Sequence, residues 1–163
     1  MNKILFVLLI IPFFSFSQNL KMSEILEIRG KDIGQIEEYL TAKKWNFIGS
    51  EKNNINFSYN QEIYGSKAES FLKVYFISDN SSLNWLSIQI HKKEKYIEYL
   101  NDIKSFGCKL IKSEIKEGNL VKTYKGKTLI FEITVSDNKN SFSNVKSFYD
   151  IFVLPIGEYE QYF

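Results

Sequence analysis

Among its 163 residues the chain has one cysteine, one histidine, one arginine and two prolines. A single thiol, Cys108, cannot form a disulfide within the chain, so packing has to stabilise the fold. Cys108 follows Gly107 and precedes an apolar stretch, which predicts a buried small hydrophobe and no nucleophile. Because histidine and cysteine are so scarce, no zinc or haem pattern exists, and we expect no metal and no cofactor.

The scarcity of histidine also restricts catalysis. A Ser-His-Asp or Cys-His arrangement would have to use His91, which stands at a predicted strand end beside Lys92 and Lys93. The chain has no GxSxG elbow and no Gly-rich phosphate loop, and its glycines stand singly at predicted turns. We therefore predict no catalytic residues and a protein that is not an enzyme.

The chain also has no large excess of charge of one sign. The net charge is +2 for the whole chain, which is too small to attract nucleic acid or a membrane surface. Arg29 is the only arginine, the residue best suited to grip carboxylates and phosphates. Lysines alternate with aromatic residues around Lys122 to Lys127, as in some RNA-binding sheets, but neighbouring acids oppose that interpretation. We predict no nucleic-acid partner.

The N-terminus carries the one long apolar run, from Ile4 to Phe14, after Lys3. It is about half as long as the roughly 20 residues that a membrane-spanning helix needs. Small residues in Ser15-Phe16-Ser17 fit a signal-peptidase site, with cleavage between Ser17 and Gln18. Residues 1–17 are therefore predicted to be a signal peptide. Residues 18–163 would form a single domain without a membrane span, exported to the periplasm or outside the cell.

A weak internal repeat has a spacing close to 60 residues. The matched segments are IEEYLTAKKWNFIGSE (Ile36–Glu51) with YIEYLNDIKSFGCKLIKSE (Tyr96–Glu114), Phe71–Asn80 with Leu129–Asn138, and Asn84–Ile90 with Ser147–Val153. Segments matching in the same order predict a tandem duplication, with repeats at about 31–91 and 95–154.

Each repeat is predicted to be a helix followed by about four antiparallel strands. The helices are expected at Asp32–Lys44, with Asp32 as N-cap, and at Lys95–Phe106. Their apolar stripes are Ile33, Ile36 and Leu40, and Tyr96, Leu100 and Ile103, with Tyr99 and Phe106 alongside. Strands are expected at Trp45–Ser50, Ile55–Asn60, Phe71–Ser78, Leu83–His91, Cys108–Glu114, Leu120–Tyr124, Thr128–Ser136 and Ser147–Leu154.

This pattern predicts an α+β fold, most simply one curved sheet with both helices side by side on one face. Two separately packed sheets are the alternative. Ser23–Arg29 is a possible further short helix, and the tail after Pro155 is expected to be a short surface segment.

Two carboxylates and several aromatic residues are candidates for a site on the opposite face. Glu132 and Asp150 fall in predicted strands of the second repeat, where their counterparts in the first are Val74 and Ser87. Such a pair could hydrolyse glycosides, but a polar outer face of a half-buried sheet explains it equally well. Phe47, Phe57, Phe131, Phe148 and Phe152 are expected to point into the core.

Trp85 shares a strand face with Ser87 and Gln89 if Leu86, Ile88 and Ile90 face the core. An exposed tryptophan near Tyr75 would form a contact patch for a protein or glycan, and a second core layer is the alternative. The binding residues that the sequence suggests are Trp85, Tyr75, Gln89, Glu132 and Asp150.

The segments EEYLTAKKWNFIGSE and KTYKGKTLIFEITVS, with FSFS before Gln18, resemble an uncharacterised family of exported proteins of Gram-negative bacteria. The resemblance covers most of the mature chain and implies export, but no activity and no site residues. In architecture alone, two helix-plus-four-strand units are similar to the beta-lactamase-inhibitor-protein fold.

The sequence thus favours an exported, non-enzymatic binding or interaction module, with a protein or glycan of the cell envelope as its partner. The alternatives are a structural or assembly accessory of the envelope and, less favoured, a hydrolase that depends on carboxylates such as Glu132 and Asp150.

Overall fold

The structure, a computed structural model, describes residues 19–61, 68–76, 84–136 and 148–162. The predicted signal peptide and its cleavage site lie outside these residues.

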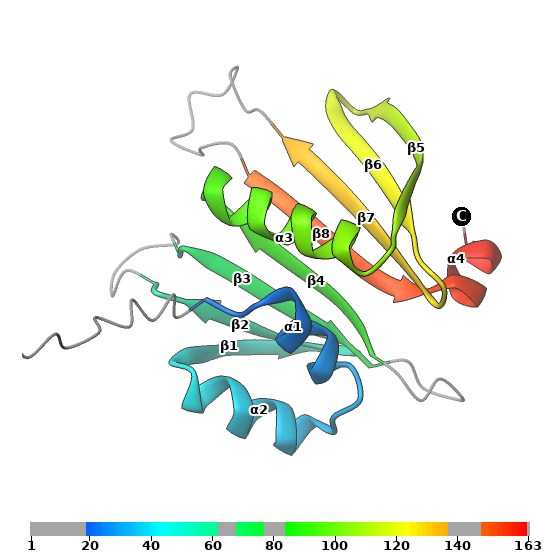
Figure 1. Ribbon diagram of the computed structural model, residues 1–163. Coiled ribbons are helices and arrows are strands. Elements are labelled where there is room, and N and C mark those ends of the chain that lie inside the picture. The colour runs from blue at the N-terminus through cyan, green and yellow to red at the C-terminus, as the bar shows by residue number, and fades with distance from the viewer. Residues whose placement is uncertain (1–18, 62–67, 77–83, 137–147, 163) are drawn as a thin grey trace, which may run out of the picture.

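Eight antiparallel strands form one sheet in the order β1-β2-β3-β4-β8-β7-β6-β5 (Figure 1). The strands are β1 (Trp45–Glu51), β2 (Asn54–Tyr59), β3 (Ser70–Tyr75), β4 (Trp85–Ile90), β5 (Lys109–Lys116), β6 (Asn119–Lys125), β7 (Leu129–Ser136) and β8 (Phe148–Pro155). The first four form one meander and the last four another, and the two meanders join where β4 pairs with β8. The predicted α+β class and single sheet are confirmed.

In the parts of the chain that the structure describes, four helices accompany the sheet: α1 (Met22–Ile28), α2 (Ile33–Ala42), α3 (Lys93–Ser105) and α4 (Ile156–Tyr162). The first three lie on the same face of the sheet (Figure 1). Asp32 caps α2 as predicted, since its carboxylate accepts a 2.9 Å hydrogen bond from the Gln35 amide. Gly107 follows α3 with a φ of 80°, the left-handed geometry in which glycine ends a helix.

Alternation along the strands sets the core against this helical layer. One buried row crosses the sheet from Ile55 through Val74, Leu86, Val153 and Phe131 to Tyr124, each residue opposite the next. Helix side chains complete the core from the other side, among them Ile25, Ile36, Tyr99 and Ile103, all fully buried. Burying each large apolar side chain contributes roughly 1.5–3 kcal/mol, so the core between the sheet and the helices stabilises the fold strongly.

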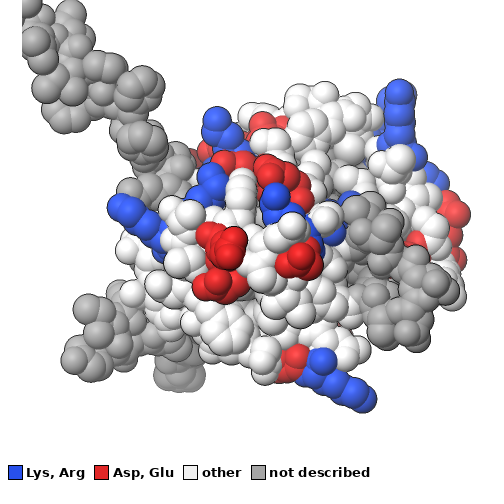
Figure 2. Space-filling view, turned by 90° about the horizontal axis from the view of Figure 1, so that it is seen from below, with Lys and Arg blue, Asp and Glu red and all other residues white. Residues whose placement is uncertain are grey.

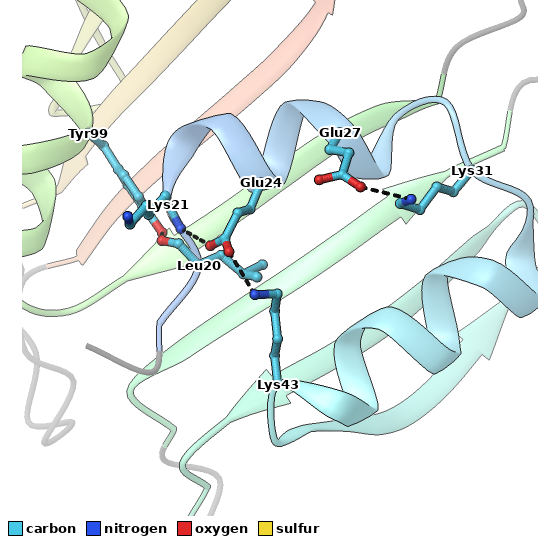
Figure 3. A network of polar contacts seen from close by, with 7 residues as sticks. All are labelled: Leu20, Lys21, Glu24, Glu27, Lys31, Lys43 and Tyr99. Carbon is cyan, nitrogen blue, oxygen red and sulfur yellow. Dashed lines mark hydrogen bonds and ion pairs between the residues drawn. The ribbon is translucent and has the colours of Figure 1, made fainter. Parts of the chain in front are cut away.

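The two longer helices do not pack side by side as the sequence predicted, because α1 lies between them (Figure 3). The Tyr99 hydroxyl of α3 donates a 2.6 Å hydrogen bond to the Leu20 carbonyl, immediately before α1. On the other side, the Lys43 ammonium after α2 lies 2.7 Å from the Glu24 carboxylate of α1. Burial opposes ionisation of Glu24, but the Lys21 backbone N–H and the Lys43 ammonium outweigh it and lower the pKa of Glu24.

Several predicted core positions are wrong. Ile33 and Phe47 are each 53% exposed, since Ile33 lies in the first turn of α2 and Phe47 on edge strand β1. Phe106 is exposed beyond the end of α3. Phe148 and Phe152 lie on the sheet face away from α1, α2 and α3, whereas Phe57 and Phe131 are buried as predicted.

The two meanders are arranged symmetrically. Each follows a helix that ends in a left-handed residue, Lys44 or Gly107, and each begins with a strand bulged at an isoleucine, Ile48 or Ile111. Matching the bulges makes Phe47 equivalent to Leu110, as in the sequence repeat. Strand pairing then makes Phe57 equivalent to Tyr124.

For the other segments that match in sequence, strand pairing makes different residues equivalent from those that the sequence match pairs. Leu72 and Phe131 pair with Phe57 and Tyr124 and are therefore equivalent, one residue away from the sequence match. That shift reverses the strand face. The residues that this symmetry makes equivalent to Glu132 and Asp150 are Lys73 and Trp85, which lie one and two residues from the sequence counterparts Val74 and Ser87. The tandem duplication itself remains a prediction.

The tail after Pro155 forms helix α4, which the sequence did not predict. Its first residue, Ile156, donates a backbone hydrogen bond to the Thr128 carbonyl, which turns the chain after β8. Further along, the Glu160 carboxylate lies 3.0 Å from the Lys125 ammonium of β6. Ile130 and Leu154 sit opposite each other on the face away from α1, α2 and α3, yet are almost fully buried, because α4 packs against β7 and β8 there.

Replacing Tyr99 with Phe should lower the free energy of unfolding by roughly 1–2 kcal/mol, because the buried Leu20 carbonyl loses its donor. Tyr96→Phe is the matched control, since its ring stacks on Tyr149 at 4.3 Å and the substitution keeps that contact. Urea denaturation of both variants measures the difference. Equal stability of the two variants would contradict the proposed anchoring of α1.

Candidate functional site

The candidate site lies on the sheet face opposite α1, α2 and α3, called here the outer face. Cross-strand register brings the predicted residues to its centre. Gln89 of β4 is directly opposite Asp150 of β8, and Tyr75 is opposite Trp85. Glu132 of β7 is opposite Phe152, one strand away from Ser87. All five predicted binding residues therefore share one face.

A hollow of about 430 Å³, the outer-face hollow, opens among these strands. Its apolar walls include Phe71, Tyr75 and Phe148, and its polar lining includes Asn56, Lys73, Ser87, Gln89 and Asp150. Tyr75, Gln89 and Asp150 thus line the hollow, while Trp85 and Glu132 lie beyond its lining.

Aromatic rings connect Trp85 to the hollow. Phe152 stands between Tyr75 and Trp85 and contacts both edge to face, with ring centroids 5.9 Å and 5.8 Å apart. The indole Nε1 of Trp85 donates a hydrogen bond to the Glu158 carboxylate of α4. Trp85 is therefore held in place by the C-terminal helix and is only partly exposed.

Asp150 is an acidic residue in the lining of the hollow. The Ser87 hydroxyl donates a 2.7 Å hydrogen bond to its carboxylate. Burial raises the pKa of Asp150 and nearby Glu132 adds to the rise, while the Ser87 hydrogen bond and Lys73 oppose it. Within the described parts of the chain, Asp150 has no ion pair within 4.0 Å.

Lys73 is the one cation among the described residues that line the hollow. Its ammonium lies 5.8 Å from the centre of the Tyr75 ring and 3.9 Å from the Glu51 carboxylate. This geometry is a cation–π contact with a carboxylate beside it. Lys73, Phe71 and Phe152 were not singled out as site residues, although their positions on the alternating strand face could have identified them.

A second hollow, of about 680 Å³, opens between α2 and the β1–β2 hairpin. Exposed Ile33 and Phe47 line it, together with Phe76, which precedes residues outside the described ranges. Its larger size reflects apolar surface at the edge of the sheet. It holds none of the predicted site residues.

The chemistry of other groups is limited. The described residues contain no cluster of three or more histidine, cysteine or acidic side chains that could hold a metal ion. Burial raises the pKa of the Cys108 thiol, and Cys108 is buried as predicted. His91 contacts Phe71 edge to face at 6.4 Å.

Arg29, the sole arginine, is used inside the fold. It is 3% exposed, and its Nε donates a 2.9 Å hydrogen bond to the Asn84 carbonyl. Asn84 in turn donates from its side-chain amide to the Lys31 carbonyl, which ties the end of α1 to the start of β4. Arg29 is therefore not an anion-binding residue on the surface.

The charges on the face seen in Figure 2 are mixed in sign. Seen from the side of α2, acidic and basic side chains lie close together instead of forming a field of one sign (Figure 2). None of the described helices is long and apolar enough to cross a membrane.

Comparison with known proteins gives no match: no family model, no curated protein and no solved structure matches the chain. The resemblance to a family of exported Gram-negative proteins therefore remains a prediction.

Replacing Asp150 with Asn should raise the free energy of unfolding at pH 7, because the amide keeps the Ser87 hydrogen bond without a partly buried charge. The gain should vanish below pH 3.8, the unfolded-state pKa, where Asp150 is protonated in both states. It should grow as the pH rises through the higher folded-state pKa. Thermal unfolding between pH 3 and pH 8 measures this dependence.

Glu132→Gln provides the control, since it removes a charge that raises the pKa of Asp150 while leaving Asp150 in place. The carboxyl carbon of Asp150, followed by NMR, should then titrate at lower pH than in the wild type. A loss of stability at pH 7 in the Asp150→Asn variant would show instead that the carboxylate stabilises the fold.

Proposed function

We propose that this protein is a non-enzymatic binding module that holds its partner on the outer face. The observation that carries this proposal is the outer-face hollow, where a partly buried carboxylate without an ion pair in the described chain lies among aromatic rings. A half-buried charge opposes folding, so its presence favours a role in recognition.

The N-terminal sequence supports export, which would place the partner in the cell envelope or outside the cell. Tyrosine and tryptophan next to polar amides suit protein surfaces and glycans alike. The mixed surface charges favour neither nucleic acid nor an anionic membrane. An envelope accessory without a ligand is the alternative, and it would not need the outer-face hollow.

One observation supports a second candidate function, that of a hydrolase that uses carboxylates. Glu132 and Asp150 lie on adjacent strands, and Glu132 helps to raise the pKa of Asp150. Glycosidases use a pair of neighbouring carboxyl groups as acid and base or nucleophile. In that case Asp150→Asn and Glu132→Gln should each abolish a measured hydrolysis, whereas unchanged turnover would exclude both residues.

The binding proposal predicts that Gln89→Arg blocks the site. Gln89 is directly opposite Asp150, so an arginine there would extend into the hollow and pair with that carboxylate. Binding of purified protein to a glycan array and to solubilised envelope proteins should fall by about tenfold or more.

Ile97→Arg is the matched control, because it places the same side chain on the exposed side of α3 and should bind as the wild type does. If the wild type retains no protein or glycan above blank resin, the binding proposal is wrong. Binding that survives in Gln89→Arg would place the partner elsewhere on the surface.

A further inference from the structure

We propose that the outer-face hollow recognises a primary ammonium group, carried by a lysine side chain or by an amino sugar. This inference rests on the proposed function and names the ligand chemistry of the same site. It follows from the charges, the rings and the volume that the structure brings together.

The charges that face this part of the sheet are mainly negative. Asp150 and Glu51 line the hollow, and Glu132 is near enough to act on the Asp150 carboxylate. Lys73 is the only cation that the described residues contribute to the lining, and its ammonium lies 3.9 Å from the Glu51 carboxylate. Lys73 pairs with Glu51 and acts on Asp150 only from beyond 4.0 Å, so among the described residues the neutral Ser87 hydroxyl is the hydrogen-bond partner of the Asp150 carboxylate. An anionic ligand would meet repulsion there.

The aromatic rings suit a cation as well. Lys73 already places its own ammonium over the Tyr75 ring at 5.8 Å, within the range of a cation–π contact. Phe71 and Phe148 line the same hollow, so a second ammonium at Asp150 would also have ring surface beside it. A partly desolvated carboxylate beside rings binds an ammonium more strongly than either group does alone.

The volume and the polar lining limit the ligand to a small group. A hollow of about 430 Å³ lies within the range of small-molecule sites and is too small for a folded segment of chain. The amides of Asn56 and Gln89 add hydrogen-bonding groups at its sides. They can bind the hydroxyls of a sugar or the backbone of a peptide, which leaves both carriers of the ammonium open to test.

NMR titration of the purified protein can decide the ligand chemistry. The probes are Nα-acetyl-lysine methylamide and glucosamine, each paired with a neutral analogue, Nα-acetyl-norleucine methylamide and N-acetylglucosamine. We expect at least one ammonium probe to bind about tenfold more tightly than its neutral analogue, with shifts at Gln89 and Asp150. The Asp150→Asn substitution should lower the affinity for that ammonium probe by at least about fivefold and leave the affinity for the neutral analogue unchanged.

Glu38→Gln is the control, since it removes an exposed carboxylate from α2, on the other side of the sheet, and should leave binding unchanged. Preference for the lysine probe supports a peptide ligand, and preference for glucosamine supports an amino sugar. Ammonium probes that bind no better than their neutral analogues, or equally well to Asp150→Asn, overturn the inference. If Gln89→Arg still blocks partner binding in that case, the outer face remains the binding site and only the ligand class is wrong.

Discussion

The pairing of β4 with β8 is the contact on which the rest of the structure depends. It is the single junction between two four-stranded meanders, and it extends over five residue pairs from Leu86–Val153 to Ile90–Tyr149. On the helical side the pairing brings Leu86 and Ile88 against Val153 and Ile151, all fully buried. Without it, each meander would expose one more open edge, which is a hazard for aggregation. On the outer face the same pairing creates the candidate site, because Ser87 and Gln89 come from one meander and Asp150 from the other.

The outer edges of the sheet are protected by other means. β1 and β5 each carry a bulge at an isoleucine, which twists the edge and interrupts regular pairing. Lysines at positions 109, 112 and 116 line β5, and lysines on an edge discourage pairing with another chain. These features explain why Phe47, Leu110 and Ile111 can stay exposed at the two ends of the sheet.

Much of the fold could be predicted from residue patterns, since local signals set the elements. Period-two alternation located the strands, and Asp32 and Gly107 marked a helix start and a helix end. Alternation also placed Trp85, Ser87 and Gln89 on one face, once Leu86 and Ile88 were assigned to the core. What the sequence could not show was the order of the helical layer, because the position of α1 depends on tertiary contacts with Lys43, after α2, and with Tyr99 of α3. Helix α4 was missed because it is short and is held by tertiary contacts such as the one between Glu160 and Lys125.

The site residues were harder to predict, for a reason that lies in the symmetry. The register makes Ser87 equivalent to Phe152, and these two residues face each other across the β4–β8 junction, at the centre of the approximate twofold arrangement. Around that centre the meanders differ in chemistry at equivalent positions, since Lys73 corresponds to Glu132 and Trp85 to Asp150. A comparison of the two repeats by sequence looks for residues that stay the same, and it therefore passes over such a site. The first meander supplies Lys73, Glu51 and the Trp85 indole, and the second supplies Asp150 and Glu132. A symmetric sheet thereby acquires a hollow whose lining differs between the two meanders.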